Sequence, residues 1–161
     1  MLEWIKDPEI GRFFRFDAEA ATAESQAAFV QAAQQETAET LHLACVDEND
    51  EYLGTVSLKE IDHVNGTAEY ATAFRRAAQG SGAAAFATEE ILRIAFGRLG
   101  LQRVYLNVLT DNARAARFYE KVGFVREGEF RSHFLLRGQR KNLLWYAILK
   151  EEFEQRYGKS D

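Results

Sequence analysis

The hexapeptide Gln79-Gly80-Ser81-Gly82-Ala83-Ala84 leads directly into a long helical pattern and is the most informative stretch of the chain. Its two glycines allow a tight turn and keep side chains away from the backbone N–H groups that begin the helix. Such groups, with the positive end of the helix dipole, form a site for phosphate. An ordinary helix entry would look the same. The hexapeptide lacks the Lys-Ser/Thr pair of a nucleotide triphosphate loop and the three glycines of a dinucleotide fingerprint, which disfavours both cofactor classes.

Composition and charge limit the class of protein. The chain has 161 residues, of which 47% are hydrophobic, so we expect a single domain over residues 1–161. A net charge of −5 without a basic stripe argues against a nucleic-acid partner. No apolar run is long enough to span a bilayer, and residues 1–6 lack a signal-peptide pattern. We therefore expect a cytoplasmic protein without a membrane partner.

The residue types that most often carry nucleophilic or metal chemistry are few. Cys45 is the single cysteine, and it lies in the apolar string of residues 41–46, which favours a buried inert thiol over a nucleophile. His42, His63 and His133 show no metal-ligand spacing, so no metal is expected.

Hydrophobic periodicity predicts an α+β (α/β) fold, with a mixed, mostly antiparallel central sheet of about six or seven strands flanked by helices. Asn65-Gly66 predicts a tight turn between the second and third strands. Phe86 is expected on the apolar side of the long helix, and Phe29 and Val30 are expected to anchor an earlier one. The predicted elements are a short helix and turn within residues 2–16, a helix at 22–35, strands at 41–46, 52–61 and 67–74, a helix at 82–99, a strand at 103–108, a helix at 113–122, strands at 124–136 and 142–149, and a helix at 150–157.

Several connections have recognisable signals. Thr110-Asp111-Asn112 supplies N-cap residues for the helix at 113–122, and Gly100 ends the long helix. The short links around that long helix predict a crossover, which places the strand at 103–108 in the same sheet. The acidic turn Asp47-Glu48-Asn49-Asp50-Glu51 is compatible both with attraction of a polyamine and with a solvated hairpin turn.

Two motifs in this order resemble a known family. Residues 79–84 fit the Gln/Arg-x-x-Gly-x-Gly/Ala turn of the GCN5-related N-acetyltransferases, after a strand and before a helix. Residues 112–124, Asn112-Ala113-Arg114-Ala115-Ala116-Arg117-Phe118-Tyr119-Glu120-Lys121-Val122-Gly123-Phe124, resemble the family's second signature. The resemblance extends over residues 41–153 and is nearest to ribosomal-protein alanine, spermidine and amino-sugar N-acetyltransferases. Residues 60–70 are similar to the spermidine enzymes, and residues 142–149 to the amino-sugar group.

The resemblance implies acetyl-CoA as co-substrate. Its pyrophosphate would bind the backbone of residues 79–84, and its pantetheine arm would pair with a third strand that splays from the fourth. Arg75 and Arg76 precede the turn, where a cation would meet a phosphate, although a solvated edge explains either arginine equally well. The cofactor residues implied in this way are Thr72, Ala73, Phe74, Arg75, Arg76, Gln79, Gly80, Ser81, Gly82, Ala83, Ala84, Asn112, Ala115 and Tyr119.

The implied chemistry is acyl transfer from a thioester to an amine. The attacking ammonium must lose a proton, and the leaving thiolate is better stabilised beside a proton donor. Tyr119 occupies the family's tyrosine position and is the candidate donor, with a core tyrosine as the alternative. Glu69 is the candidate base, directly or through water, with a solvated strand glutamate as the alternative. Strand alternation places Glu69, Ala71 and Ala73 on one face and Tyr70, Thr72 and Phe74 on the other.

Two functions follow from the resemblance. The first is an acetyl-CoA-dependent N-acetyltransferase whose acceptor is a primary amine: a polyamine, an amino sugar or a protein N-terminus. Members of this branch usually begin with a strand before the first helix, whereas this chain begins with residues that resemble that helix, so we expect either that the first strand is absent or that the start has been shortened. The second function is therefore a non-catalytic acyl-CoA-binding regulatory module. An edge exposed by a missing strand would favour a homodimer.

Overall fold

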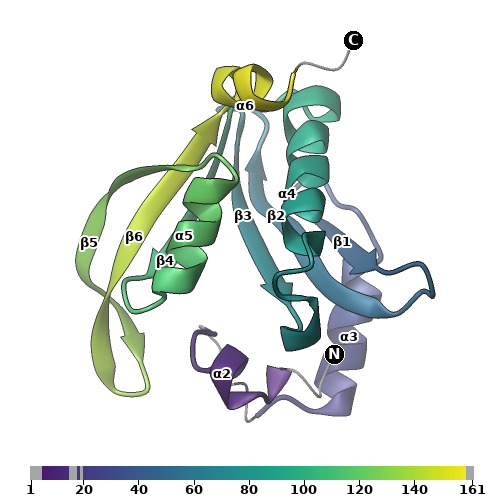
Figure 1. Cartoon of the computed structure of the whole chain (residues 1–161), viewed down its shortest axis with the longest axis vertical. Coiled ribbons are helices and arrows are strands. Elements are labelled where there is room, and N and C mark those ends of the chain that lie inside the picture. The colour runs from purple at the N-terminus through teal and green to yellow at the C-terminus, as the bar shows by residue number, and fades with distance from the viewer. Residues whose placement is uncertain (1–4, 15–17, 19, 159–161) are drawn as a thin grey trace.

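The computed structural model describes residues 5–14, 18 and 20–158, and it is organised around one six-stranded sheet (Figure 1). The strand order is β1-β2-β3-β4-β6-β5, and every neighbouring pair is antiparallel except β3 with β4, which are parallel. The predicted mixed, mostly antiparallel sheet is thus confirmed. The strands are β1 (Leu41–Val46), β2 (Tyr52–Asp62), β3 (Thr67–Phe74), β4 (Arg103–Leu109), β5 (Val125–Leu136) and β6 (Gln139–Leu149).

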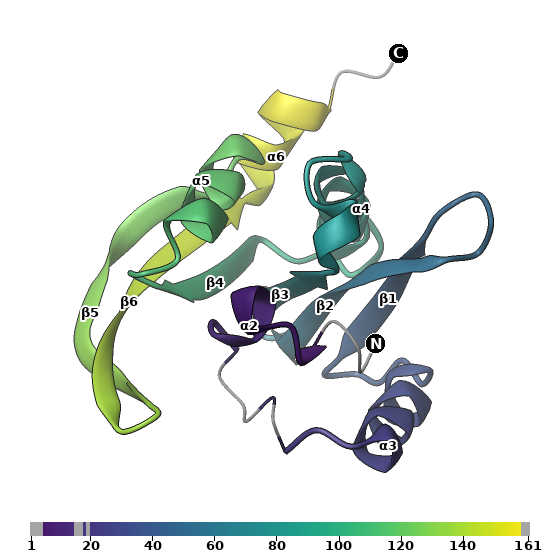
Figure 2. The same cartoon turned by 60° about the horizontal axis from the view of Figure 1, so that its bottom comes forward.

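Helices cover both faces of this sheet. The helices α4 and α5 pack on one face, where their apolar residues join those of β2, β3, β4 and β6 in the main core, whereas α3 lies on the other face (Figure 2). The helical segments are α2 (Pro8–Gly11), α3 (Ala23–Ala33), the 3₁₀ turn η1 (Arg76–Ala78), α4 (Ala83–Arg93), the π-helical turn η2 (Ile94–Arg98), α5 (Ala113–Lys121) and α6 (Lys150–Tyr157).

The parallel ladder between β3 and β4 is short. It joins Thr67 to Arg103, Ala68 to Val104 and Glu69 to Tyr105. Beyond this point β3 continues beside β2 as far as Phe74, while β4 continues beside β6 as far as Leu109. Each of the two strands stays paired with its outer neighbour, and β3 and β4 no longer pair with each other. The sheet therefore opens between residues 70–74 of β3 and residues 106–109 of β4 (Figure 1). We call this opening the sheet split.

Residues alternate along β3 as predicted. Ala68, Tyr70 and Phe74 are buried in the core beneath the helices, whereas Glu69, Ala71 and Ala73 are only half-buried. Successive side chains of a strand point to opposite faces, so Glu69 belongs to the face that α4 and α5 do not cover. We call the face that α4 and α5 do not cover the second face.

The helix predicted over residues 82–99 is present, and its last part is a wider turn. It is α-helical to Arg93 and continues as η2, where the Leu99 N–H bonds to the Ile94 carbonyl at 2.9 Å. One expectation about its apolar side was wrong. Phe86 is 65% exposed rather than packed, because its position shares the solvent side with Glu90 and Arg93 while alanines fill the contact with the sheet.

The helix α3 also packs less than predicted. Phe29 and Val30 were expected to anchor it, yet they are 42% and 38% exposed, and none of its residues is buried. The Phe29 ring meets His42 of β1 edge-on, with centroids 5.7 Å apart. Because β1 is an edge strand, it offers this helix little apolar surface.

The N-terminal expectations are tested only in part. Within the predicted helix and turn of residues 2–16, the structure has α2 at Pro8–Gly11. Residues 1–4, which precede this helix, lie outside the described residues, as do residues 15–17 and 19.

One buried polar pair ties the sheet to α4. The Tyr70 hydroxyl lies 2.8 Å from the Thr88 hydroxyl, and Thr88 donates its own hydrogen to the Ala84 carbonyl at 2.6 Å. A hydroxyl has one hydrogen to donate, so Tyr70 is the donor in the first contact. Burial raises the pKa of Tyr70 to about 12. The pair fixes the first turns of α4 against β3 at the beginning of the sheet split.

We predict that Tyr70→Phe lowers the free energy of unfolding by about 1 kcal/mol at pH 8, because Thr88 loses its buried partner. The folded pKa lies above the ordinary value of 10.0, so the stability due to the neutral hydroxyl is present below pH 10 and is lost as pH rises toward 12. The difference between wild type and Tyr70→Phe in urea unfolding should therefore narrow above pH 10. The control, Thr88→Val, removes the same bond but keeps the titrating hydroxyl, and should show no such narrowing. A constant difference from pH 8 to 11 for Tyr70→Phe would contradict this assignment.

Candidate active site at the end of the β3–β4 ladder

The glycine turn has an open backbone. Gly80 and Gly82 have φ of +82° and +88°, a region that favours glycine, and a Cβ added at either would meet nothing within 4 Å. Gly82 is the N-cap of α4, and the first helical bond runs from the Phe86 N–H to the Gly82 carbonyl at 3.0 Å. The N–H groups of the preceding turn therefore lie before the intrahelical ladder begins. This arrangement fits a phosphate held by backbone groups.

Ser81 stabilises the turn from inside. Its hydroxyl donates to the Ala78 carbonyl at 2.6 Å and accepts from the Ala83 N–H at 3.3 Å. The Ala78 carbonyl also accepts from the Ser81 N–H at 3.3 Å, so the serine side chain reinforces a backbone hydrogen bond of the turn. The consequence is an ordered loop whose outer surface is exposed at Gly80, Ser81 and Gly82.

Two helices begin where the sheet split is widest. The helix α4 follows the end of β3 through η1, and α5 follows the end of β4 (Figure 1). Asn112 caps α5, as predicted, because its side-chain oxygen accepts from the Ala115 N–H at 3.2 Å. Both positive helix ends therefore lie at the open end of the split, which favours an anionic group there.

The two arginines beside the turn differ. Arg75 is held by the β1–β2 hairpin, because its guanidinium pairs with Glu51 and donates to the Tyr52 carbonyl at 3.2 Å. Arg76 begins η1 and is exposed. Within the acidic turn the Asp47 carboxylate accepts from the N–H groups of Asn49 and Glu51, at 2.8 and 2.9 Å. The acidic turn thus stabilises its own hairpin through Asp47 and fixes the Arg75 side chain through Glu51.

Tyr119 lies at the beginning of the sheet split, on the helix side. Its ring is 6.2 Å from that of Tyr70, the first residue of β3 beyond the ladder, and 6.4 Å from that of Tyr146. Tyr146 pairs with Leu106, the first residue of β4 beyond the ladder. The half-buried Tyr119 therefore packs against residues from both sides of the opening.

Glu69 lies at the same point on the second face. It is the last residue of β3 that pairs with β4, its side chain is 12% exposed, and its carboxylate is 3.5 Å from the Lys59 ammonium. The structure thus places Glu69 and Tyr119 on opposite faces at the end of the ladder. A proton acceptor and a proton donor in this arrangement can serve the two sides of one acyl transfer.

Around Glu69 a hollow of about 670 Å³ opens on the second face. Glu60 also lines it and was not among the predicted site residues. The ladder between β2 and β3 is irregular between Lys59 and Asp62, and Glu60 has a φ of +49°. This bulge turns the Glu60 side chain toward the second face, where its carboxylate accepts a hydrogen bond from the Tyr105 hydroxyl at 3.3 Å. The next residue, Ile61, then points into the core, where it is buried. The lining residues are Ala38, Glu39, Thr40, His42, Lys59, Glu60, Ile61, Asp62, His63 and Glu69.

A row of aromatic rings on the second face was also missed. Tyr105 of β4 stacks on Trp145 of β6 with centroids 6.0 Å apart, and Trp145 stacks on Phe130 of β5 at 4.7 Å. The strands β4 and β6 are not consecutive in the chain, so the sheet order brings Tyr105 to Trp145, whereas Phe130 meets Trp145 within the β5–β6 hairpin. The row extends from Glu60 toward the β5–β6 hairpin.

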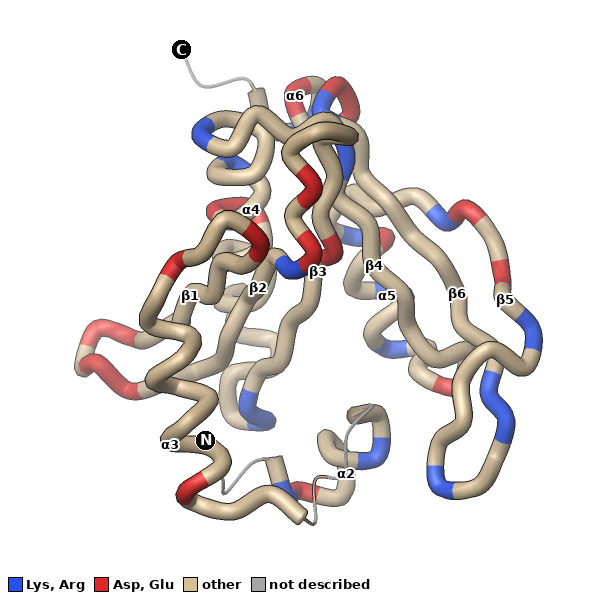
Figure 3. Tube along the Cα trace, turned by 180° about the vertical axis from the view of Figure 1, so that it is seen from behind, with Lys and Arg blue, Asp and Glu red and all other residues tan. Residues whose placement is uncertain are grey.

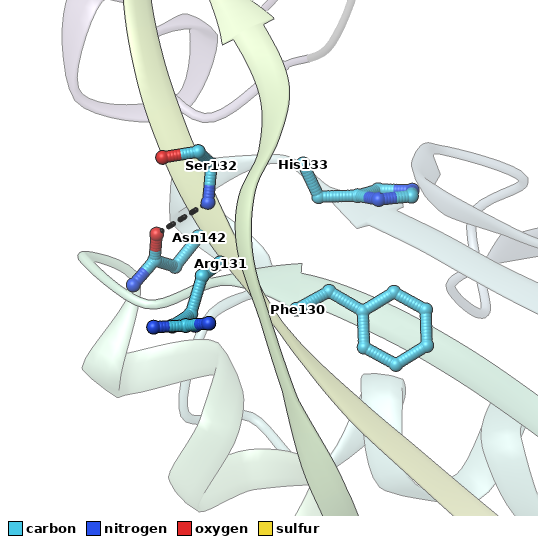
Figure 4. Close-up of a pocket in the computed structure, with 5 residues that line it drawn as sticks. All are labelled: Phe130, Arg131, Ser132, His133 and Asn142. Atoms are coloured by element: carbon cyan, nitrogen blue, oxygen red, sulfur yellow. Dashed lines mark hydrogen bonds between the residues drawn. The ribbon is translucent and has the colours of Figure 1, made fainter.

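A second hollow, of about 730 Å³, lies at an irregular part of β5 (Figure 4). There the Asn142 side chain accepts from the Ser132 N–H at 2.8 Å, and Ser132 has a φ of +51°. None of the predicted site residues lines it; its lining residues are Phe130, Arg131, Ser132, His133 and Asn142.

The histidines and the cysteine make structural contacts. His42 shares a hydrogen bond of 2.7 Å with Ser57, and burial, with the nearby Lys59 charge, lowers its pKa. Burial raises the pKa of the Cys45 thiol, which disfavours the reactive thiolate. The part of the chain that the structure describes has no group of three side chains able to hold a metal. None of its helices is long and apolar enough to cross a membrane.

Residues 1–125 match a family model described as the acetyltransferase (GNAT) domain. The chain belongs to the GNAT family. The predicted resemblance is thereby confirmed. The GNAT chain is 33% identical over 108 residues to a spermidine N(1)-acetyltransferase of Escherichia coli (strain K12), a match that covers 67% of this chain and 58% of the relative. It is 31% identical over 101 residues to a putative ribosomal N-acetyltransferase of Bacillus subtilis (strain 168), covering 63% and 55%.

Solved structures share the fold. A spermidine N-acetyltransferase from Vibrio cholerae, solved in complex with CoA and spermine, superposes with a TM-score of 0.82 at 22% identity, covering 94% of this GNAT chain and 89% of the other. The sequence matches to the curated relatives cover less of those proteins: the chain spans less than two thirds of their length.

We predict that Gly82→Val weakens acetyl-CoA binding at least about tenfold, because a side chain with an unfavourable φ would distort and cover the turn. Isothermal titration without an amine measures the change. The control is Gly100→Ala, since Gly100 also has a positive φ, of +66°, and open space around its Cβ position, but lies at the far end of the helix. Equal affinity of Gly82→Val and wild type would refute the phosphate-binding role of the turn.

Proposed function

We propose that this GNAT chain forms one acetyltransferase domain, which transfers the acetyl group of acetyl-CoA to a primary amine of a small cationic molecule. One observation carries the proposal: the parallel ladder stops at Glu69 and Tyr105, and the glycine turn, Glu69 and Tyr119 are arranged around the opening that follows. The catalytic activity of the curated relatives favours this function over a non-catalytic module.

The proposed cofactor residues fit an acyl-CoA. The open backbone of residues 79–84 and the exposed Arg76 suit a pyrophosphate, with Asn112 and Ala115 at the neighbouring helix start. Thr72, Ala73 and Phe74 have β2 on one side and the sheet split on the other, which suits pairing with an amide-bearing arm. Arg75 is the weakest member of this set, because Glu51 already neutralises it. When bound, the thioester supplies the activated acetyl group.

Glu69 and Tyr119 would divide the proton transfers. The Glu69 carboxylate, directly or through one water, takes a proton from the ammonium on the second face and frees the nitrogen lone pair. The Tyr119 hydroxyl donates its proton to the departing sulfur on the helix side. After the attack the nitrogen still carries two protons and loses one of them through solvent to the Tyr119 phenolate, so the amide and the thiol leave, while Glu69 releases its proton to solvent.

The charge around the site favours a cationic acceptor. Acidic residues gather on the β1–β3 part of the sheet and basic ones on the β5–β6 part (Figure 3). The hollow beside Glu69 contains the carboxylates of Glu39, Glu60 and Asp62, and Lys59 is its one lysine. A desolvated ammonium is stabilised by such carboxylates. The spermidine enzymes among the relatives act on an amine of this class.

We also propose a cytoplasmic homodimer without nucleic-acid or membrane partners. The acidic net charge supports the absence of nucleic acid. Within the described residues, the edge strands β1 and β5 each pair with another strand on one side only, which supports strand-mediated pairing of two copies.

Mixing the purified protein with acetyl-CoA and a panel of amines, and following free thiol, tests the function. The panel contains spermidine, glucosamine and a peptide with a free N-terminal alanine. We expect turnover with spermidine to exceed turnover with the peptide. Saturable acetyl-CoA binding without thiol release from any amine would contradict the proposal and support the non-catalytic module.

We predict that Tyr119→Phe lowers kcat by about 100-fold while changing acetyl-CoA affinity less than about threefold, because it removes the proton donor and keeps the ring. Steady-state kinetics and titration measure the two effects. Tyr157→Phe serves as a control, since the Tyr157 hydroxyl donates to the Val122 carbonyl in the α6 region, away from the split. An unchanged kcat in Tyr119→Phe would remove this residue from the mechanism.

We predict that Glu69→Gln lowers kcat/KM by at least about tenfold at pH 7, and that the loss shrinks as pH approaches about 10, where the free amine forms without a base. The pH profile from 6.5 to 10 tests this. Glu127→Gln, which changes a carboxylate paired with Arg103, is the charge-matched control. A loss that is constant across this range would leave Glu69 as a binding residue only.

A further inference from the structure

The side-chain oxygen of Asn107 is buried without a hydrogen-bond partner. Among the described residues, this Oδ1 is the one buried side-chain nitrogen or oxygen atom in that state. Buried amide oxygens nearly always accept a hydrogen bond, because leaving one unpaired is unfavourable. Asn142, on the adjacent strand, illustrates the usual state: its oxygen accepts from Ser132 and its NH₂ donates to Glu129. The unpaired oxygen of Asn107 is therefore available to accept a hydrogen bond from a donor group of a bound ligand.

The position of Asn107 identifies the side from which that donor comes. It is the second residue of β4 beyond the ladder, and its neighbours Leu106 and Val108 are buried in the core. Alternation directs the Asn107 side chain to the second face, together with Tyr105 and Glu69. Along the strand it lies about 7 Å beyond Tyr105, the partner of Glu69.

Within the described residues, no donor lies at hydrogen-bond distance from Asn107 Oδ1. On one side it pairs with Trp145 of β6. On the other side is the sheet split, where Ala71 would be the next facing residue of β3 if the ladder continued in register. A methyl group cannot donate a hydrogen bond, and it leaves more room than a larger side chain. A ligand group entering between these strands is thus the partner that the fold leaves open.

We propose that Asn107 Oδ1 accepts a hydrogen bond from the nitrogen of the acceptor amine and so positions it for attack, an assignment that rests on the proposed function. Asn107 is a positioning residue whose oxygen touches the substrate. The group bound is a primary amine, attached to any body that fits the second face.

The proton transfers of the reaction suit a neutral amide, and not a second carboxylate, at position 107. The ammonium carries three N–H bonds; one proton passes to Glu69, and the neutral amine keeps two. Asn107 accepts one of these while the lone pair attacks the acetyl carbon, the C–S bond breaks, and Tyr119 protonates the sulfur. The nitrogen then gives up one of its two protons through solvent to Tyr119, which leaves the neutral amide. A neutral oxygen orients the nitrogen without adding another negative charge that would hold the proton on it.

Asn107→Leu separates this role from a structural one. In the free protein it removes no hydrogen bond, so the melting temperature should stay the same or rise, whereas Asn142→Leu, the matched control, should lower it. Acetyl-CoA affinity measured without amine should change less than twofold. The KM for the amine should rise at least about tenfold, by a similar factor for spermidine and for butylamine, because the contact involves only the reacting nitrogen.

Two further measurements make the test decisive. Asn107→Asp restores an oxygen at the same place and should recover most of the amine affinity. Amine binding is also followed as a thermal shift of the CoA-loaded protein, which has no acetyl group to transfer and needs no turnover. An unchanged amine KM and thermal shift in Asn107→Leu, a loss of acetyl-CoA affinity as large as the loss for the amine, or no recovery in Asn107→Asp would each overturn the assignment. Absence of thiol release by the wild type would instead overturn the proposed function.

Discussion

The site depends on where the hydrogen bonds between two parallel strands stop. The strands β3 and β4 pair through Glu69 and Tyr105 and then part, because each keeps an antiparallel neighbour on its outer side. Parting exposes two strand edges inside a sheet, where backbone groups normally pair with each other. A protein that leaves such edges open within its sheet is suited to receive an extended ligand with amide groups.

The surrounding elements hold this opening in place. On the helix side, Tyr119 packs against Tyr70 and Tyr146, which come from the two halves of the sheet. The buried contact from Tyr70 to Thr88 connects the same point to the first turns of α4 and thus to the glycine turn. The candidate phosphate-binding backbone and the candidate proton donor are therefore fixed to one strand, which limits their relative movement.

The second face has a different character. A bulge in β2 turns Glu60 toward Glu69, and the aromatic row of Tyr105, Trp145 and Phe130 borders the acidic hollow. Bulges near active sites commonly redirect a side chain that regular alternation would send elsewhere. Carboxylates on this face and backbone N–H groups at the helix starts form two environments of opposite charge preference, which suit the proposed amine and the proposed phosphate group respectively.

Much of the fold was predictable from local signals. The glycine turn, the Asn65-Gly66 turn, the Asn112 cap and the alternation of β3 depend on backbone conformation or on residues a few positions apart, so the amino-acid order itself determined them. The orientation of Phe86 was wrongly predicted because an apolar residue near the edge of a helix face can turn either way, and packing on the sheet decides. The bulge at Glu60, the pairing of Arg75 with Glu51 and the unpaired oxygen of Asn107 belonged to the tertiary structure alone. Each of these depends on which strands become neighbours and where their pairing ends, and strand pairing joins residues that are distant in the chain.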